Sequence, residues 1–259
     1  MKKSYFQTYI SIREDLFLNK KNHQLYETDS IECVQSKDLE LYKKLCVAQF
    51  YVNDNISELD SIIKKRVAQK EDTSLYHLVI NTTLDCNLRC WYCYETKFKG
   101  SQLKPSVVEA IKNNIVIHYK DNNYTTLKIS FFGGEPFMNF KAIKSILIYA
   151  KTFCDCKSIK LIADFTTNST LINSTMIDFL KDYNCMFQIT LDGDKEQHNK
   201  VKAIKGIDTF QLAVNNIYKL TDEIPLSKIW VRINYDMDTL KNIDNIYNKL
   251  DGLNRKKYI

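Results

Sequence analysis

The stretch HLVINTTLDCNLRCWYC, residues 77–93, sets the fold expectation for the whole chain. It opens with an apolar run typical of a buried strand, and three cysteines follow in a C-x3-C-x2-C pattern. Apolar runs farther along predict four more strands, and helical patterns separate them. These strands are predicted over 126–132, 158–165, 186–191 and 229–234, and several are apolar on both faces, as in a buried parallel sheet.

Helical spacing of apolar residues predicts a helix after each strand, the first of them opened by Pro105. Five successive βα units predict an α/β fold with a parallel sheet or partial barrel over residues 77–259. Residues 1–70 read instead as a small α+β module. Its predicted elements are strands over 4–10, 24–28 and 50–52 and helices over 36–47 and 57–69, with a polar linker over 67–76.

Composition places the chain among ordinary globular proteins. It has 259 residues, of which 44% are hydrophobic and 26% charged, which excludes wholesale disorder or a fibre. The sequence contains no run of 18 apolar residues, so it predicts no membrane-spanning helix. The net charge of +6 is spread along the chain, so nucleic-acid binding is not required. The N-terminus lacks the pattern of a signal peptide, and we expect a cytoplasmic protein without membrane partners.

Polar or special residues follow every predicted strand, where α/β folds place their ligand sites. The cysteine cluster follows the first strand, and a ligand site is therefore predicted at the carboxyl edge of the sheet. The later strands are followed by Gly133-Gly134-Glu135-Pro136, by Thr166-Thr167-Asn168, by Asp192-Gly193 and by Asn234.

The cysteine triplet consists of Cys86, Cys90 and Cys93. Thiolates suit zinc or an iron–sulfur cluster. Structural zinc takes four ligands, and the next histidine and cysteine are His118 and Cys154, so a zinc site needs a distant fourth ligand. Three thiolates on a four-iron cluster leave one iron open for a substrate, and together with the glycine pair this favours the cluster. We assign no metal to the remaining cysteines at 33, 46, 154, 156 and 185.

The segment CNLRCWYCYE, residues 86–95, resembles the signature of radical SAM enzymes, in particular the branch that carries a SPASM domain and matures peptides or proteins. The resemblance covers about residues 77–236 and continues through FFGGEPFMN, TTNSTL, ITLDGDKEQHNK and VRIN. It implies a partial, TIM-like (β/α)6 barrel, of which about five βα units are visible. It also implies an auxiliary-cluster region that this chain does not contain, so we expect a fragment or a truncated protein.

The resemblance implies that Cys86, Cys90 and Cys93 bind a [4Fe-4S] cluster, with S-adenosylmethionine as the second cofactor. The glycine pair and Glu135 would receive the methionyl ammonium, so that Gly134→Val is expected to impair S-adenosylmethionine binding more than folding. Lys202 stands where similar proteins carry arginine, His198 is expected to be structural, and no catalytic side chain is assigned. The implied cofactor contacts are Tyr92, Gly133, Gly134, Glu135, Pro136, Thr166, Asn168, Thr190 and Asn234.

The function implied by the resemblance is reductive cleavage of S-adenosylmethionine to a 5′-deoxyadenosyl radical. This radical would modify a ribosomally synthesised peptide or protein by cross-linking or oxidation. Residues 1–70 would hold a leader peptide or cover the barrel, and a flavodoxin or ferredoxin would donate the electron. The alternative is a truncated, non-catalytic iron–sulfur or peptide-binding homologue that assists a full-length maturase.

Overall fold

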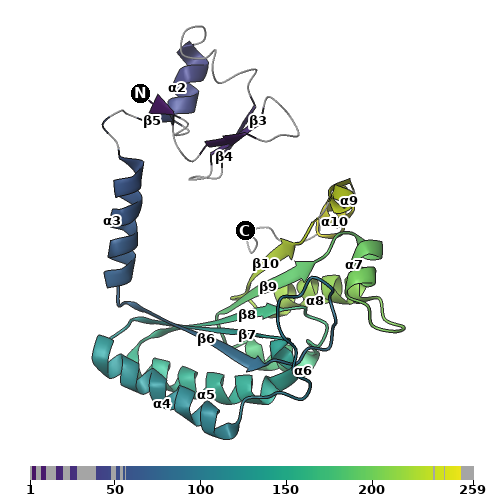
Figure 1. The fold of residues 1–259 in the computed structure, drawn as a ribbon. Helices are drawn as coiled ribbons and strands as arrows, with labels where there is room; N and C mark the ends of the chain where they lie inside the picture. The colour runs from purple at the N-terminus through teal and green to yellow at the C-terminus, as the bar shows by residue number, and fades with distance from the viewer. Residues whose placement is uncertain are drawn as a thin grey trace. The chain divides into compact units, whose positions relative to one another are not determined.

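The computed structural model describes residues 2–3, 7–9, 16–19, 24–27, 39–47, 51–52, 55, 57–235, 237–241 and 243–251. The chain divides into two compact units, residues 1–72 and 73–259. Both units are drawn in Figure 1, and each is described by itself.

In the residues that the structure describes, the first unit combines short antiparallel strands with the helices α2 and α3. Its helix α3 begins after Ser57, whose hydroxyl accepts a hydrogen bond from the Asp60 amide at 3.1 Å, and it continues to Glu71. The polar linker predicted over 67–76 is therefore wrong, because α3 and the next strand occupy most of it. The elements are β1 (Lys2–Lys3), β2 (Gln7–Tyr9), β3 (Leu16–Asn19), β4 (Gln24–Glu27), α2 (Leu39–Val47), β5 (Tyr51–Val52) and α3 (Glu58–Glu71).

Among these elements, β1 pairs with β5, and β2, β3 and β4 form a meander. The sequence did not predict β1 or β3. Parts of the predicted strand over 4–10 and of the predicted helix over 36–47 lie outside the described residues. Cys33 also lies outside them.

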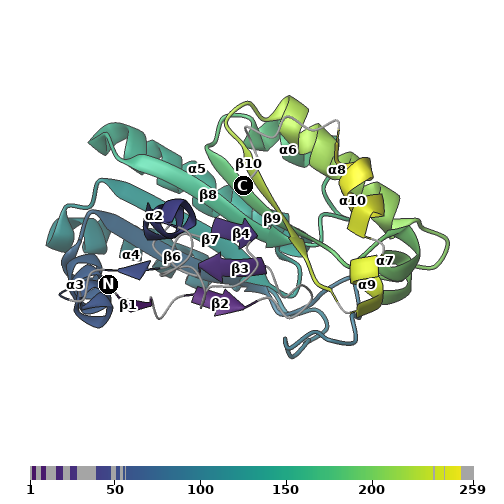
Figure 2. The same ribbon diagram turned by 90° about the horizontal axis from the view of Figure 1, so that it is seen from above.

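The second unit is a five-stranded sheet in the order β10-β9-β8-β7-β6, and every neighbouring pair is parallel. Figures 1 and 2 show its strands beside one another in this order. The predicted α/β fold with a parallel sheet is confirmed. The strands are β6 (Leu75–Thr83), β7 (Thr126–Gly133), β8 (Lys160–Thr167), β9 (Cys185–Leu191) and β10 (Lys228–Ile233).

Helices connect the strands and pack on one face of the sheet. Pro105 stands at the first position of α4, as its fixed φ favours. The sequence did not predict the short helix α7. The helices are α4 (Pro105–Asn122), η1 (Pro136–Asn139), α5 (Phe140–Lys157), α6 (Ser174–Leu180), α7 (Lys195–Val201), α8 (Thr209–Glu223), α9 (Met237–Lys241) and α10 (Ile243–Lys249).

The hydrophobic core lies between the sheet and these helices. Phe131, Phe165 and Phe187 come from three neighbouring strands, and their rings stack at centroid distances of 5.3 and 5.1 Å. The apolar stripe of α5 covers them with Ile143 and Leu147, which are fully buried. Burying such side chains stabilises the fold by about 2 kcal/mol each.

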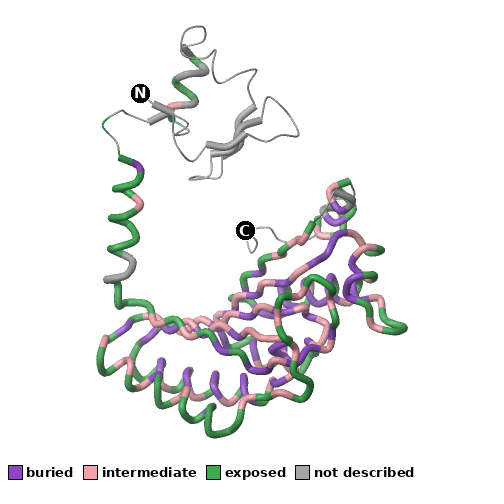
Figure 3. Tube along the Cα trace, in the orientation of Figure 1, coloured by how far each residue is buried: buried purple, intermediate pink, exposed green. Residues whose placement is uncertain are grey.

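The opposite face of the sheet is not packed like a core. Buried and partly buried or exposed residues alternate along β7 and β9, as Figure 3 shows in the changing colour of the tube. The expectation of strands apolar on both faces is therefore wrong for this sheet. A period of two means that one face meets the helices and the other is open or lines a cavity.

No helix in the described part of the chain is long and apolar enough to span a bilayer.

Candidate functional site

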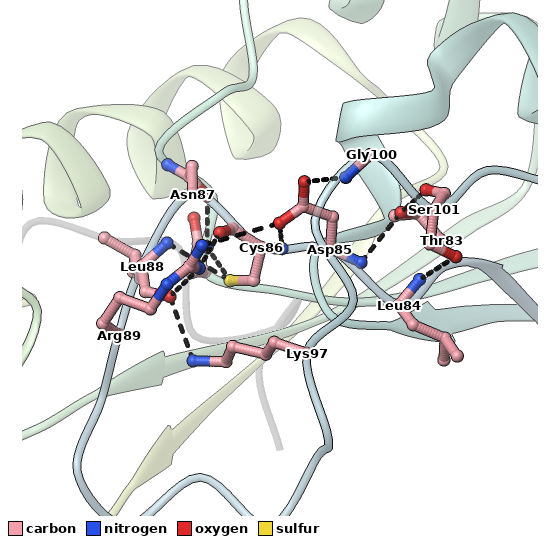
Figure 4. Close-up of polar contacts among 11 residues, drawn as sticks. Thr83, Leu84, Asp85, Cys86, Asn87, Leu88, Arg89, Lys97, Gly100 and Ser101 are labelled. Carbon is pink, nitrogen blue, oxygen red and sulfur yellow. Dashed lines mark hydrogen bonds and ion pairs between the residues drawn. The ribbon is translucent and has the colours of Figure 1, made fainter.

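The three cysteines lie on a long loop between β6 and α4, called the cysteine loop here (residues 84–104). Backbone hydrogen bonds close its base, from Phe98 N to Leu84 O and from Leu103 N to Thr82 O, both at 3.1 Å. Asp85 ties its two arms together, because its carboxylate accepts from the Cys86 amide at 2.8 Å and from the Gly100 amide at 2.7 Å (Figure 4). These amides, the Gly100 amide first, hold the pKa of Asp85 below its usual range.

Cys86, Cys90 and Cys93 all line one cavity of about 230 Å³. Cys86 is the most buried of the three, with 7% of its surface exposed. Its Sγ accepts from the Leu88 amide at 3.3 Å. Burial raises the pKa of both Cys86 and Cys90, so metal binding has to displace their protons.

This donor set fits an iron–sulfur cluster. Three cysteines line one cavity, and an amide N–H already points at the sulfur of one of them, which is a contact that tunes such clusters. Among the residues that the structure describes, no three His, Cys, Asp or Glu side chains are grouped to hold a metal ion. A structural zinc ion takes four ligands, with zinc–sulfur distances near 2.3 Å, whereas a four-iron cluster takes each thiolate at a different iron.

The glycine pair follows β7 and lies against the start of the cysteine loop. Gly133 has a φ of +113°, and the Gly134 amide donates to Thr83 O at 3.0 Å. A Cβ built on Gly134 would stand 2.1 Å from the backbone oxygen of Asp85. The glycines are thus required because two backbone segments pack closely here. From the sequence, we expected them instead to leave space for a methionyl group.

Glu135 lies behind the cavity wall and is 1% exposed. Its carboxylate accepts from Thr167 Oγ1 at 2.7 Å, from the Asn168 amide at 2.8 Å and from the Phe137 amide at 3.1 Å. Burial raises its pKa to about 6, although these donors oppose the shift. The structure therefore gives Glu135 a role that the sequence did not indicate, namely holding the end of β8 against η1. Its contact with the methionyl ammonium stays a prediction.

Asn168 joins the end of β8 to the cysteine loop. Its side-chain amide donates to Asn87 Oδ1 at 3.0 Å and lies 3.9 Å from the Cys86 sulfur. The loop that follows is held by Asn216 of α8, which donates to Ser169 O at 2.7 Å and to Ile172 O at 3.4 Å.

Asp192, after β9, is the buried centre of a polar cluster that includes Tyr92, the residue directly before the third cysteine. It accepts from Tyr92 Oη at 2.7 Å and from Asn234 Nδ2 at 2.9 Å. The Lys202 ammonium lies 3.4 Å from its carboxylate and donates to Thr190 O at 2.5 Å. Burial, followed by the Asp192 contact, raises the pKa of Tyr92. The cluster attaches the cysteine loop to the ends of β9 and β10.

The cavity brings together residues from the ends of all the strands except β6, and from the cysteine loop after β6. Of the sequence-predicted contacts, Glu135 and Pro136 are not in the cavity lining, and the rest are. The expected structural residue His198 is fully buried beside the site, where its Nδ1 accepts from the Asp192 amide at 3.2 Å. The predicted residues that line the cavity are Cys86, Cys90, Tyr92, Cys93, Gly133, Gly134, Thr166, Asn168, Thr190 and Asn234.

The sequence reasoning missed Arg232 as a lining residue and left the role of Lys202 open. Arg232 stands two residues before Asn234, on the same face of β10, so the strand period of two could have found it. Lys202 is 3% exposed yet lines the cavity, which puts a positive charge beside the thiols. Nothing in its local pattern separates it from a solvated lysine.

Comparison with known proteins gives several relatives. The radical SAM cyclopropyl synthase TigE of Paramaledivibacter caminithermalis is 24% identical over 73% of this chain and 48% of its own length. A cysteine-type anaerobic sulfatase-maturating enzyme of Clostridium novyi is 29% identical over 67% of this chain and 47% of its own. The chain thus spans less than half the length of either relative.

The solved structure of anSMEcpe with bound AdoMet and the Cp18Cys peptide aligns with a TM-score of 0.57 at 22% identity. The alignment covers 68% of this chain and 47% of that one, and it shows a shared fold. A family model described as the radical SAM superfamily matches residues 80–245, which is more than half of the chain. The chain therefore belongs to the radical SAM superfamily, whose members use a [4Fe-4S] cluster and S-adenosylmethionine.

Proposed function

We propose that this protein cleaves S-adenosylmethionine reductively and uses the resulting radical to modify a ribosomally synthesised peptide or protein. The observation that carries the proposal is the single cavity onto which the three cysteines and the strand ends open. Cys86, Cys90 and Cys93 would hold the cluster through their thiolates. When bound, the cluster and S-adenosylmethionine supply an electron and a 5′-deoxyadenosyl radical.

The chain's own residues would bind and orient these groups. Lys202 brings a buried ammonium to the cavity, where it suits a carboxylate. Thr190 and Asn234 offer neutral hydrogen-bonding groups on the same wall, suited to hydroxyl and amino groups of a nucleoside. The Tyr92–Asp192 hydrogen bond would keep the loop between Cys90 and Cys93 at the strand ends. The apolar lining from Leu88 and Phe132 excludes water from part of the cavity.

A peptide or protein substrate is supported by the named relatives, which include a sulfatase-maturating enzyme, and by a structural neighbour with a bound peptide. We propose that the first unit, residues 1–72, binds a leader segment of that substrate by adding a strand to one of its short sheets. A flavodoxin or ferredoxin would supply the electron. Thiol ligands to a cluster require a reducing compartment, which supports a cytoplasmic location.

Anaerobic reconstitution of the full chain tests the proposal. We expect about four irons and four sulfides per chain, because three cysteines serve one cubane cluster. Dithionite and S-adenosylmethionine should then give 5′-deoxyadenosine. Cys90→Ala should abolish both the cluster and the product, whereas Cys156→Ala, a matched change at an exposed cysteine, should leave both intact.

Two results would contradict the proposal. A zinc-loaded, colourless protein would show that the cysteines form a structural site. A cluster that binds without any cleavage of S-adenosylmethionine would instead favour a non-catalytic homologue that assists another maturase.

A further inference from the structure

The open face of the sheet carries a second polar cluster, outside the residues that line the cavity. The open face is formed by the residues of β6 to β10 that point away from α4, α5 and α8. In a closed barrel of eight βα units, the corresponding inner face is normally filled by branched apolar side chains. Here most positions on that face are polar and none is fully buried: His77, Asn81, Lys128, Ser130, Asp164, Thr166, Gln188, Thr190, Lys228 and Arg232.

Four of these residues, from three adjacent strands, form one hydrogen-bonded chain. His77 Nε2 of β6 lies 2.8 Å from Ser130 Oγ of β7. The Ser130 hydroxyl donates to Asp164 Oδ2 of β8 at 2.8 Å. The Lys128 ammonium pairs with the same carboxylate oxygen at 2.7 Å. The parallel register places Ser130 directly opposite Asp164 and Lys128 opposite His77.

The direction of these hydrogen bonds determines which ring nitrogen of His77 carries the proton. The Asp164 carboxylate beside Lys128 can only accept, so the Ser130 hydroxyl gives its proton to Asp164. Ser130 Oγ must then accept from the Nε2–H of His77. The other ring nitrogen, Nδ1, is left with a lone pair on an exposed side chain. Burial and the Lys128 charge lower the pKa of His77, while Asp164 opposes them, so the neutral ring prevails near neutral pH.

This chain of residues is continuous with the cofactor cavity. Ser130 stands two residues before Phe132, and Asp164 two residues before Thr166, and both later residues line the cavity. Residues i and i+2 of a strand share one face and are about 7 Å apart. His77 itself is in register with Lys128, four residues before Phe132, so a group held at His77 lies on the same wall of the sheet, about 13 Å from the level of the cavity lining. This is the distance between residues about four positions apart in an extended bound peptide.

We propose that His77, oriented by Ser130 and Asp164, binds a neutral hydrogen-bond donor of the peptide substrate, namely the side-chain hydroxyl, thiol or carboxamide of a residue about four positions from the reacting one. Lys128 and Asp164 cancel in charge, so the site offers an acceptor without net charge, which selects a neutral polar side chain over a carboxylate. Ser130 and Asp164 act as positioning residues. This inference rests on the proposed function, because it takes the occupant of the open face to be that substrate.

The test uses the full chain with its cluster reconstituted and S-adenosylmethionine present. The probes are two capped tripeptides, glycine–serine–glycine and the matched glycine–alanine–glycine, titrated to millimolar concentration. The readout is the NMR signal of the His77 ring, whose nitrogen shifts also report the tautomer. We expect the serine peptide to bind about tenfold more tightly than the alanine peptide, as one hydrogen bond of ordinary strength provides.

Variants separate binding from folding. His77→Phe should remove the preference for the serine peptide over the alanine peptide. In this variant, binding is measured from the NMR signals of the peptides themselves. The matched variant His118→Phe on α4 should keep the preference. Ser130→Ala should change the tautomer ratio of His77 and reduce the discrimination. Equal binding of the two peptides by the wild type, or discrimination that survives in His77→Phe, overturns the proposal.

Peptide-free formation of 5′-deoxyadenosine, measured on the same samples, distinguishes the two proposals. Product without discrimination leaves the proposed function standing and refutes the subsite. Discrimination without product supports the subsite and refutes the proposed radical chemistry.

Discussion

Gly134 shows at the scale of one residue how backbone packing builds the site. Its position leaves no room for a side chain, because a Cβ would meet the Asp85 carbonyl oxygen at 2.1 Å. The expectation that substitution here affects cofactor binding more than folding treated the glycine as a ligand contact. The close approach of two backbones is a long-range fact that no local pattern reveals.

Gly134→Ala should therefore push the cysteine loop away from β7 and lower the free energy of unfolding by more than ~2 kcal/mol, as overpacking does. Urea unfolding of the cluster-free protein and its iron content after reconstitution measure the effect. The matched control is Gly100→Ala, where a φ of +75° is strained but no atom lies within 4 Å. It should cost only about 1 kcal/mol. An equal loss of unfolding free energy in the two variants would show that the cysteine loop can move away from β7 without strain.

His198 makes stability depend on pH. Burial, followed by Lys202, lowers its pKa to about 4 from an ordinary 6.5, while Asp192 and Asp208 oppose the shift. Below about pH 6.5 the unfolded chain therefore binds more protons than the folded chain. The stability that the fold gains from keeping His198 neutral is complete above that pH, and it is lost as the pH falls toward 4. We expect the wild type to lose ~2 kcal/mol more than His198→Phe between about pH 7 and pH 4.5. Denaturant unfolding at both values checks this, and parallel losses would exclude the imidazole as the cause.

At the scale of elements, the strands were the most predictable part of the fold. Each of the five strands of the sheet lies within two residues of its predicted ends, because long apolar runs between helices leave few alternatives. Which face they bury was not predictable in the same way. We expected several strands to be apolar on both faces, yet in MFQITL at 186–191 Gln188 and Thr190 belong to the open face. Only the packing of α5 and α8 on one side separates the two faces.

Helix α8 depends on a polar residue as well as on its apolar stripe. Asn216 of α8 donates two hydrogen bonds to the loop after β8, the loop that begins with Asn168. Asn216→Ala would leave the carbonyl oxygens of Ser169 and Ile172 without these donors, at a cost of about 1–3 kcal/mol.

Chemical denaturation, with hydrogen exchange of residues 168–173, measures this effect. The neighbouring exposed residue provides the control, since Asn215→Ala should stay within about 0.5 kcal/mol of wild type. Unchanged exchange in the loop of the Asn216 variant would contradict the assigned role.

On the scale of the whole molecule, the division into two units separates the cavity from the first 72 residues. Every residue that lines the cavity lies between Cys86 and Asn234. A chain of residues 73–259 should therefore reconstitute its cluster and form 5′-deoxyadenosine without peptide, at a rate within about threefold of the full chain. Iron content and product analysis check this. Insoluble protein would favour the opposing view, in which the first unit covers the barrel.

The sequence predicted the carboxyl edge as the site because strand direction alone brings five loops to one edge. It did not predict the cluster around Asp192, since Tyr92, Lys202 and Asn234 are far apart along the chain and meet only through the parallel register of β9 and β10. Contacts of this kind depend on tertiary structure, and a single sequence carries no local signal for them.

The positions of the aromatic residues have an optical consequence. The chain contains two tryptophans. Trp91 stands on the cysteine loop, 80% exposed and edge-on to the Tyr92 ring, and Trp230 lies on the open face, opposite Gln188. All tryptophan fluorescence of this 259-residue chain thus comes from the surroundings of the cavity. An iron–sulfur cluster absorbs light at the wavelengths where tryptophan emits, so loading the site will quench that emission, and the chain carries its own built-in probe of occupancy.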